Sequence, residues 1–409
     1  MRLTATYLFS LLMVLFTIGG VGYVGAQTYD ADGLYTDTVF HDHINRQADD
    51  FVSAYYVVAQ PGGALYSIFG HACLHLVCPA FGLDYYFSYE SEDATQRVLR
   101  FFAGNLQMGM MALTAEQYLS AYRSEGRGVV EYELLLPVEV KRELWRVLDE
   151  HVAEEALPYD YEQRGCAYAC TRLLSEALGD RPIRYAEWPD AFRRTRREIC
   201  YDYAHTFFPW NMAFIMMMVG TEVDKPLPPE EKLIIPSGLA TVWQAAQVAG
   251  RPVLSSEPIV VLPEVSSYRR PWCTPLLVAC ALLVLVLLGW GLKVPYVDWI
   301  VLVIATLIGA FVTYLVLFST LPCTHWNWLI IPFNVLPAVG WHWRRYWALP
   351  YAVGCVIWLA GMVLAPHRLA DPSCLVLAVA WIVVLLKQVP WQTYKQCCLR
   401  RRVRSLTVN

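Results

Sequence analysis

The spacing of apolar residues separates a leader, a region of mixed polarity and an apolar C-terminal region. Near the start, an apolar run from Tyr7 to about Val24 ends in small residues, a pattern typical of a secretory signal that is cleaved after Ala26. Because this run is slightly long, an uncleaved anchor is the alternative for residues 1–26. Either one exports residues 27–270, whose mixed charges and Pro-rich tail predict a globular domain followed by an extended linker.

Beyond residue 270 the sequence is strongly apolar in five separate runs. Each run is long enough, or nearly so, to cross about 30 Å of hydrocarbon as a helix. The runs cover residues 275–292, 296–319, 327–342, 348–365 and 373–389. We therefore predict an all-α transmembrane domain of five helices over residues 271–395, followed by a basic tail over residues 396–409.

Basic residues support one orientation of these runs. They follow the first, third and fifth runs, as Lys293, Arg344, Arg345, Lys395, Arg400, Arg401, Arg402 and Arg404. Positively charged loops stay in the cytoplasm. We therefore expect a multi-pass membrane protein with its globular domain exported and its C-terminus in the cytoplasm; the family resemblance described below implies the inner (cytoplasmic) membrane and the periplasm.

The third run differs from the other four in its polar and helix-breaking residues. It contains Asn327, Pro332, Asn334 and Pro337 within a short apolar segment. In lipid, such residues would leave backbone groups without hydrogen-bond partners. We expect either backbone that lines a cavity or packs against protein, or a kinked helix with tryptophans at the membrane interface.

Composition narrows the class of protein. The chain is 56% hydrophobic and 17% charged, against about 25% charged residues in ordinary soluble domains. These values exclude a disordered chain and a coiled coil, and they do not fit a purely soluble protein. The net charge of −4 gives no global basic field, so we expect a membrane partner and no nucleic acid.

The cysteines of the exported domain allow disulfides but do not predict a metal site. Disulfides form outside the cytoplasm, and an odd number of cysteines leaves one free thiol unless Cys273 takes part. The spacing does not match the paired ligands of zinc sites, so no metal is expected. The cysteines within the domain are Cys73, Cys78, Cys166, Cys170 and Cys200.

A strand pattern places two histidines together in the exported domain. From Ala72 onward, apolar residues alternate with others, which predicts a strand with His71 and His75 on one face. A second strand is predicted over Leu83–Tyr89. The glycine before His71 allows backbone or ligand to approach closely. For either histidine, a hydrogen-bonded core residue is the structural alternative to a catalytic one.

A helical pattern begins at Cys166. Apolar residues recur from Cys166 to Leu178 at helical spacing, between Gly165 and Gly179. Cys166 is therefore expected in the first turn, where unpaired N–H groups and the helix dipole favour a thiolate. Cys170, one turn deeper on the same face, is expected in the core. A buried structural thiol or a disulfide is the alternative for Cys166.

Several short motifs, in a fixed order, resemble a known family. They read Ser67-Ile-Phe-Gly70-His71-Ala72, Tyr122-Arg-Ser-Glu-Gly126-Arg127, Asp160-Tyr-Glu-Gln-Arg-Gly165-Cys166, Phe208-Pro-Trp210-Asn211 and Asp224-Lys-Pro226. Together with the apolar runs, they resemble the Bacteroides-type lipoprotein N-acyltransferases over nearly the whole chain. That family typically reads Asp-Asn-Cys-x-Thr-Arg, so Cys170-Thr171-Arg172 is a match that competes with Cys166. Another departure is His75, which stands where the family commonly has arginine.

The resemblance implies a fold and a chemistry. The fold would be α+β, a circularly permuted papain-like periplasmic catalytic domain joined to the five-helix domain. The activity would be transfer of an acyl chain from a phospholipid, through a cysteine thioester, to the N-terminal amine of a diacylated lipoprotein, without a cofactor. Cys166 would be the nucleophile and His71 its base, with Cys170 as the alternative nucleophile. Supporting or orienting roles would fall to His75, Asp84, Ser67 and Arg127.

Two other functions fit parts of the sequence. Many papain-like bacterial thiol enzymes cut peptidoglycan, so a cell-wall amidase or peptidase is one alternative. A cell-wall enzyme needs only one anchor, however, and five apolar runs exceed that need. The second alternative is a non-catalytic membrane sensor or scaffold, in which His71 and Cys166 are structural.

Overall fold

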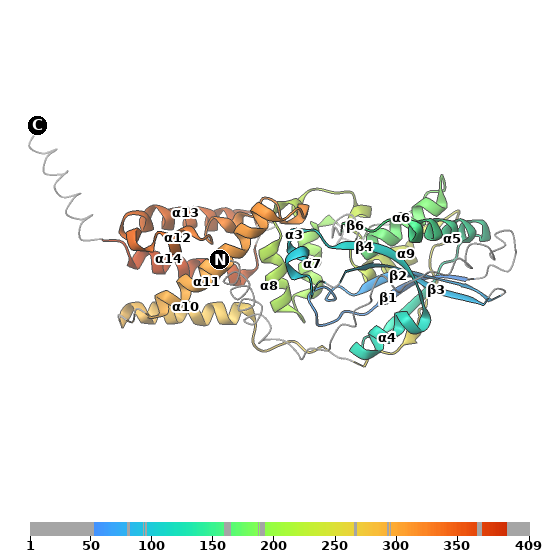
Figure 1. Ribbon diagram of the computed structural model, residues 1–409, viewed down its shortest axis with the longest axis horizontal. Coiled ribbons are helices and arrows are strands. Elements are labelled where there is room, and N and C mark those ends of the chain that lie inside the picture. Colours follow the sequence, from blue (N-terminus) through green and yellow to red (C-terminus); the bar gives the residue numbers. More distant parts are fainter. Residues whose placement is uncertain are drawn as a thin grey trace, which may run out of the picture.

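The computed structural model describes residues 53–390, apart from 80–81, 93, 95, 159–164, 187, 189–192, 266–267, 293, 295 and 366–369. The expected leader (1–26), the first part of the exported domain and the basic tail (396–409) lie outside the described residues. Within them, an N-terminal domain and a bundle of apolar helices lie end to end (Figure 1).

A seven-stranded antiparallel sheet forms the centre of the N-terminal domain (Figure 1). Its strands lie in the order β6-β4-β3-β2-β1-β5-β9. They are β1 (Ser53–Ala59), β2 (His71–Cys78), β3 (Leu83–Ser91), β4 (Gln107–Thr114), β5 (Val129–Glu133), β6 (Leu157–Pro158) and β9 (Ile259–Leu262). A separate two-stranded sheet pairs β7 (Gln247–Val248) with β8 (Arg251–Pro252).

Helices cover both faces of the large sheet (Figure 1). On one face lie α5 (Val138–Ala153), α6 (Cys166–Leu178) and α9 (Pro236–Ala245); on the other lies α4 (Ala115–Glu125). The larger core, on the first face, includes the fully buried Tyr56 and Trp243. Burying a large apolar side chain contributes about 1.5–3 kcal/mol. The domain is therefore α+β, as predicted.

The elements predicted around the candidate residues are confirmed. The two alternating runs form the paired strands β2 and β3. The helical pattern forms α6, which begins after Gly165 and ends at Gly179. α6 packs against β2.

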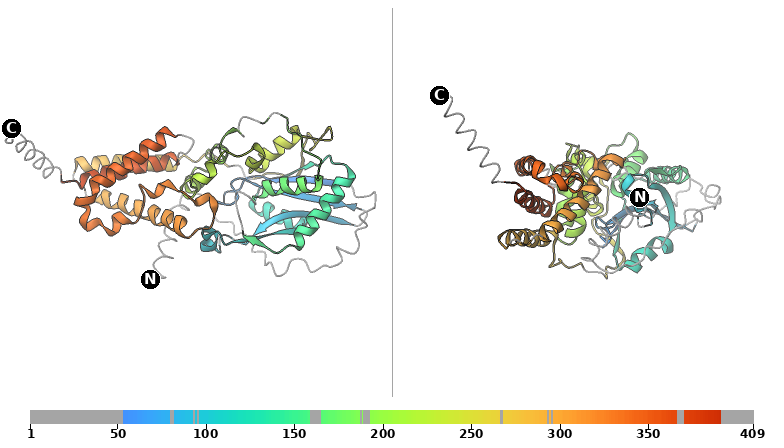
Figure 2. Two further views of the ribbon diagram at one scale, coloured as in Figure 1. Left: turned by 90° about the horizontal axis from the view of Figure 1, so that it is seen from above. Right: turned by 60° about the vertical axis from the view of Figure 1, so that its left-hand side comes forward.

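The C-terminal region contains four long apolar helices, α10 (Pro275–Gly291), α11 (Tyr296–Phe318), α13 (Arg344–Leu364) and α14 (Pro372–Lys387), seen from two further sides in Figure 2. Among the described residues, only α11 and the helical stretch 341–364 are long and apolar enough to cross a membrane. α10 and α14 are apolar but have 17 and 16 residues. The prediction of five spanning helices is therefore wrong.

The third predicted span is the clearest departure. Residues 327–342 form the short helices η7 (Trp328–Ile330) and α12 (Leu336–Val339) and enter η8 (Trp341–Trp343). This segment packs tightly on α11: a Cβ atom on Gly309 would lie 2.4 Å from the backbone nitrogen of Asn334. Side chains complete its hydrogen bonds, since Asn334 Nδ2 donates to the Ile330 carbonyl (3.1 Å). Residues 327–342 are therefore irregular backbone packed against protein, the first of the two structures expected for the third run.

Three helices join the domain to the apolar bundle: α3 (Val98–Ala103), α7 (Arg196–Ala204) and α8 (Pro209–Met218). Phe102 of α3 and Phe214 of α8 each place their ring centroid 5.2 Å from that of Phe311 in α11. The short helices η4 (Thr221–Asp224) and η5 (Pro229–Lys232) follow α8, and η6 (Pro322–Thr324) follows α11. The two parts therefore share one buried apolar cluster.

Candidate functional site

Cys166 is the first residue of α6. Gly165 is its N-cap, with extended backbone (φ −59°, ψ 146°), and no side chain caps the helix. The first N–H groups of the helix are therefore left without helical acceptors, and the helix dipole adds partial positive charge at this end. Cys166 is half-buried at this helix end, and the N–H groups and the dipole there favour a thiolate.

His71 is the first residue of β2 and is positioned by a tight turn. Gly70 has φ +82°, a left-handed conformation that suits glycine. A Cβ atom there would lie 2.6 Å from the carbonyl oxygen of Ala59. Because His71 pairs with Ala59 across β1 and β2, the turn fixes the imidazole at the end of the sheet where α6 begins.

The structure brings Cys166 and His71 into direct contact through a side-chain hydrogen bond. Burial raises the pKa of the Cys166 thiol. His71 and the backbone N–H groups of Ala72 and Ala167 outweigh it, however, so the pKa of Cys166 lies below its ordinary value. Burial lowers the pKa of His71, but the Cys166 thiolate and Glu90 raise it above its ordinary value. Both shifts are in the direction that favours a thiolate beside an imidazolium.

Ser88 and Glu90 of β3 form the second half of the site. His71 Nε2 lies 2.7 Å from Ser88 Oγ, and the Ser88 hydroxyl donates to Glu90 Oε1 (2.7 Å). Since the serine proton is used on Glu90, Ser88 Oγ is free to accept the proton of Nε2. This arrangement leaves His71 Nδ1 for the sulfur. Glu90 Oε1 is also 3.7 Å from Nε2, close enough to stabilise an imidazolium.

His75 and Asp84, which were expected near His71 as orienting groups, belong to another network. His75 Nε2 is 2.7 Å from Asp84 Oδ1, and Nδ1 is 3.0 Å from Glu131 Oε1. The His75 ring stacks on Tyr86 at 4.0 Å between centroids, on the α4 side of the sheet. The direct partners of His71 are instead Cys166 and Ser88.

Ser67 and Arg127 hold the loop that precedes His71. Ser67 is buried, and its hydroxyl donates to the carbonyl of Ala64 (3.1 Å). Arg127 donates through Nε to the carbonyl of Gln60 (2.7 Å) and through Nη1 to Glu125 (3.0 Å). Arg127 thus forms an ion pair with Glu125 that clamps the loop.

Cys170 occupies a different environment from Cys166. It lies one turn further along α6, fully inside the larger core. Burial, together with the neighbouring Cys166, raises the pKa of the Cys170 thiol well above its ordinary value. A buried neutral thiol is a poor nucleophile. Its surroundings therefore favour Cys166 over Cys170 as the reactive sulfur.

The site's loop faces the apolar bundle. Ile68, three residues before His71, is fully buried in a cluster with Phe208 and Met216 of the α7–α8 region. Leu65 packs against the cluster that the apolar helices share with α3 and α8. The end of the sheet that carries His71 is therefore the end nearest the apolar bundle (Figure 1).

Neither a disulfide nor a metal cluster occurs among the described residues. The ten cysteines in that part of the chain are free thiols, Cys166 and Cys273 included. Within the same ranges, no group of three or more His, Cys, Asp or Glu residues is arranged to hold a metal ion.

Sequence reasoning missed Ser88 and Glu90. The two residues lie two positions apart at the end of β3, so the alternation of side chains along a strand puts them on one face. The signal was present, because the predicted second strand already contained Ser88. Finding their partner required the pairing of β3 with β2, which a single sequence does not specify.

Comparison with known proteins agrees with the position of the site. Residues 41–195 match a family model described as the Lnb N-terminal periplasmic domain. A search for similar proteins found no match among curated proteins and none among solved structures. The match contains His71, Ser88, Glu90 and Cys166, and apolar helices able to span a membrane follow it. These findings support a relationship to the Lnb type and indicate a membrane protein with a periplasmic domain.

Proposed function

We propose that the protein is an acyltransferase that moves an acyl chain from a membrane phospholipid to the N-terminal amine of diacylated lipoproteins. The observation that carries this proposal is the contact of Cys166 with His71, in which the pKa of the thiol is lowered and that of the imidazole is raised. The similarity of residues 41–195 to the Lnb periplasmic domain supports it. So does the packing of the site's loop against apolar helices, because both substrates are anchored in lipid.

In the first half-reaction, the Cys166 thiolate attacks an ester carbonyl of the phospholipid. A C–S bond forms, the ester C–O bond breaks, and the His71 imidazolium gives its proton to the leaving alcohol. The products are an acyl thioester on Cys166 and a lysophospholipid. Backbone N–H groups at the beginning of α6 are available to stabilise the oxyanion that forms on the way. Ser88 and Glu90 hold the imidazole in the orientation that this proton transfer requires.

In the second half-reaction, the free α-amine of the lipoprotein's diacylglyceryl cysteine attacks the thioester carbonyl. A C–N bond forms and the C–S bond breaks, which releases the Cys166 sulfur. The neutral His71 takes the proton that the amine loses, so the thiolate–imidazolium pair is restored. Water is the competing nucleophile, and apolar surroundings that exclude it favour the amine.

The proposal includes a location. The domain would face the periplasm, several apolar segments would cross the inner membrane, and the C-terminus would lie in the cytoplasm. Arg344 Nε donates to Gln388 Oε1 (2.9 Å), so the basic residues that begin α13 and end α14 gather at one end of the bundle, as the positive-inside rule expects of a cytoplasmic end. Labelling of engineered C-terminal cysteines with a membrane-impermeant reagent would test it; labelling in intact spheroplasts would contradict it.

Substitution of the two candidate sulfurs tests the activity. The full-length chain is expressed in a host whose lipoproteins are diacylated, and their N-terminal peptides are analysed by mass spectrometry. We expect one added amide-linked acyl chain with the wild type and with Cys170→Ser, and none with Cys166→Ser at equal expression. N-acylation by the Cys166→Ser variant would refute the proposal. So would a purified wild-type chain that digests muropeptides and acylates no amine.

A further inference from the structure

The short helix α3 lies between the sheet and the apolar bundle (Figure 1). One side of it is buried, since Phe101 and Phe102 belong to the apolar cluster that the domain and the bundle share. The other side is exposed and carries Leu99 and Arg100, with Arg97 immediately before the helix. A surface that combines arginine with an exposed leucine suits a boundary between lipid and water better than water alone.

The place where α3 meets α11 gives its height relative to a membrane. α11 has 23 residues, so it is about 34 Å long. The hydrocarbon that a spanning helix must cross is about 30 Å thick. α3 is held at the last turns of α11, because Tyr314 Oη donates to the Leu99 carbonyl (3.4 Å) and the Thr320 N–H to the Ala103 carbonyl (2.9 Å). In a membrane that α11 spans, α3 would therefore lie at the level of the lipid headgroups.

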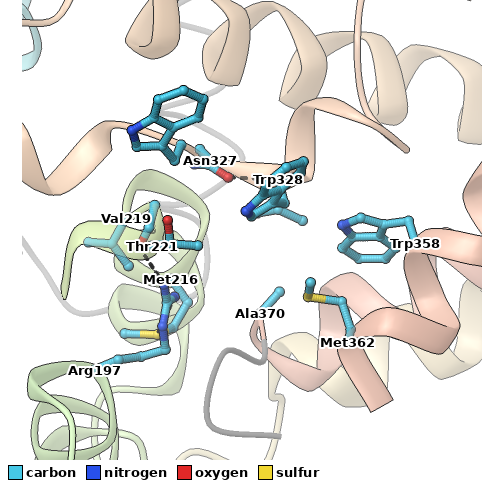
Figure 3. A pocket seen from close by; sticks show the side chains of 12 residues that line it. Arg197, Met216, Val219, Thr221, Asn327, Trp328, Trp358, Met362 and Ala370 are labelled. Atoms are coloured by element: carbon cyan, nitrogen blue, oxygen red, sulfur yellow. Dashed lines mark hydrogen bonds between the residues drawn. The ribbon is translucent and has the colours of Figure 1, made fainter. Parts of the chain in front are cut away.

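Exposed aromatic side chains mark the same level. Phe318 at the end of α11 is 65% exposed, and its ring centroid lies 5.7 Å from that of Tyr314. Trp326 and Trp328, on the loop after η6, are 68% and 48% exposed, and Figure 3 shows Trp328 where the bundle meets the end of α8. Tryptophan and tyrosine concentrate at membrane–water interfaces. The lipid-facing surface expected for the bundle thus continues through Tyr314 to Leu99.

Glu92 gathers the two arginines. Its Oε1 atom lies 2.8 Å from Nη1 of Arg97 and 3.3 Å from Nη1 of Arg100. Its Oε2 atom accepts the N–H of Gln107 in β4 (3.2 Å), which fixes the carboxylate on the sheet. The arginine side chains remain 50% and 45% exposed. A guanidinium has five N–H donors in a planar fork that matches phosphate, and phosphate is the anion that phospholipid headgroups present at this level.

The same carboxylate connects the arginines to the candidate active site. Glu92 follows β3 directly, and its N–H extends the pairing with β4 by donating to the Gln107 carbonyl (2.9 Å). It lies two residues after Glu90, a separation of about 7 Å along a strand. Glu90 accepts the hydroxyl of Ser88, which is bonded to His71. A phosphate held by the arginines would therefore lie near the end of β3 that holds the imidazole. The ester bonds of a phospholipid are attached to the same three-carbon glycerol as its phosphate.

We propose that Arg97 and Arg100 bind the phosphate of an outer-leaflet phospholipid while Leu99 contacts its acyl region, so that α3 presents a donor lipid to the active site. A soluble phosphate compound would leave Leu99 exposed to water, whereas a phospholipid covers it. The role of this lipid as acyl donor rests on the proposed function. The contact between α3 and lipid does not, because it follows from the position of α3 on α11.

Photolabelling tests the contact without any catalysis. The full-length Cys166→Ala chain is placed in phosphatidylethanolamine nanodiscs that contain a phospholipid with a diazirine in its headgroup. We expect cross-links on residues 97–103 and on residues 326–328, which lie at the same level. In the double variant Arg97→Gln/Arg100→Gln, labelling of residues 97–103 should fall about tenfold, because the charged donors are lost, while labelling of residues 326–328 stays the same. Absence of label on α3 when residues 326–328 are labelled, or label on α3 that the double variant does not reduce, would overturn the proposal.

Two single variants separate lipid binding from a purely structural ion pair. Arg181→Gln, which alters an exposed arginine beyond the end of α6, is the matched control and should leave all labelling unchanged. Glu92→Gln removes the negative partner of both arginines but keeps their guanidinium groups and an amide oxygen that orients them. We expect labelling of residues 97–103 to persist in Glu92→Gln. A loss as large as that in the double variant would mean that the arginines serve only to hold Glu92, and would overturn the proposal.

The choice of donor tests the phosphate contact at the active site. Acylation of Cys166 is followed with phosphatidylethanolamine and with diacylglycerol, which has the same ester bonds and lacks the phosphate. For the wild type we expect an apparent KM about tenfold lower with phosphatidylethanolamine, and for Arg97→Gln/Arg100→Gln we expect equal values with the two donors. Equal KM values in the wild type would contradict the phosphate contact. A wild type that neither donor acylates would refute the proposed function, while the photolabelling would still decide the contact with lipid.

Discussion

The substitution Gly70→Ala should both displace His71 and destabilise the domain. Alanine in a left-handed conformation is unfavourable by about 1–2 kcal/mol. The added Cβ would also lie 2.6 Å from the Ala59 carbonyl oxygen, a backbone atom inside the paired strands that cannot move alone. Overpacking of this kind adds about 1–3 kcal/mol. The sum is a loss of about 2–5 kcal/mol, or roughly 4–20 °C in apparent Tm for a domain of this size.

Gly63→Ala is the matched control, because it changes the same loop without strain. The nearest atom to a Cβ on Gly63 is Cε1 of Tyr268, at an ordinary 3.7 Å. The assay is thermal unfolding of the purified full-length protein by fluorescence, combined with the rate of Cys166 alkylation at pH 7 measured on its tryptic peptide. We expect Gly70→Ala to lower both quantities and Gly63→Ala to change neither. Equal Tm values for the two variants would refute the assigned role of the turn.

Three further predictions concern the residues around the pair. Because His71 lowers the pKa of Cys166, alkylation of Cys166 should persist at pH values below the ordinary thiol pKa. In His71→Ala, burial raises the pKa of Cys166 instead, so the pH profile of alkylation should shift upward. An unchanged profile would contradict the pairing. Ser88→Ala should reduce the acylation rate about 10- to 100-fold with little change in Tm, because the oriented proton transfer contributes about 10²–10⁴-fold; a wild-type rate would remove Ser88 from the site. Arg127→Met should lower the free energy of unfolding by about 1–3 kcal/mol, because the carbonyl of Gln60 loses its charged donor. Thermal unfolding measures this loss, with Arg123→Met, at an exposed position, as the control.

The helix and strands around the site could be predicted because the spacing of apolar residues and the residues that begin and end each element agreed. In α6, apolar residues at helical spacing lie between two glycines, so length and position follow from the pattern. In β2, strict alternation predicted the strand and the shared face of His71 and His75. That the two histidines have unrelated partners could not be predicted, because the partners lie on β3 and β5, far away in sequence.

The third apolar run shows the limit of hydropathy. Residues 327–342 contain enough apolar residues to suggest a spanning helix, but Pro332 and Pro337 remove backbone donors and interrupt the helix. The missing hydrogen bonds are supplied by Asn327 and Asn334, which bond to backbone groups of α8 and of the segment itself. Sequence indicated the conflict; the resolution depended on packing against α8 and α11.

Intact-mass spectrometry of the full-length protein incubated with a single phospholipid species would settle whether Cys166 carries an acyl group. Our proposal predicts a mass increase of one acyl chain, located on Cys166 by peptide mapping and removed by hydroxylamine. It predicts the same increase for Cys170→Ser and none for Cys166→Ser. An unmodified wild-type chain, or an acyl group found on Cys170, would contradict the assignment of the nucleophile and the mechanism built on it.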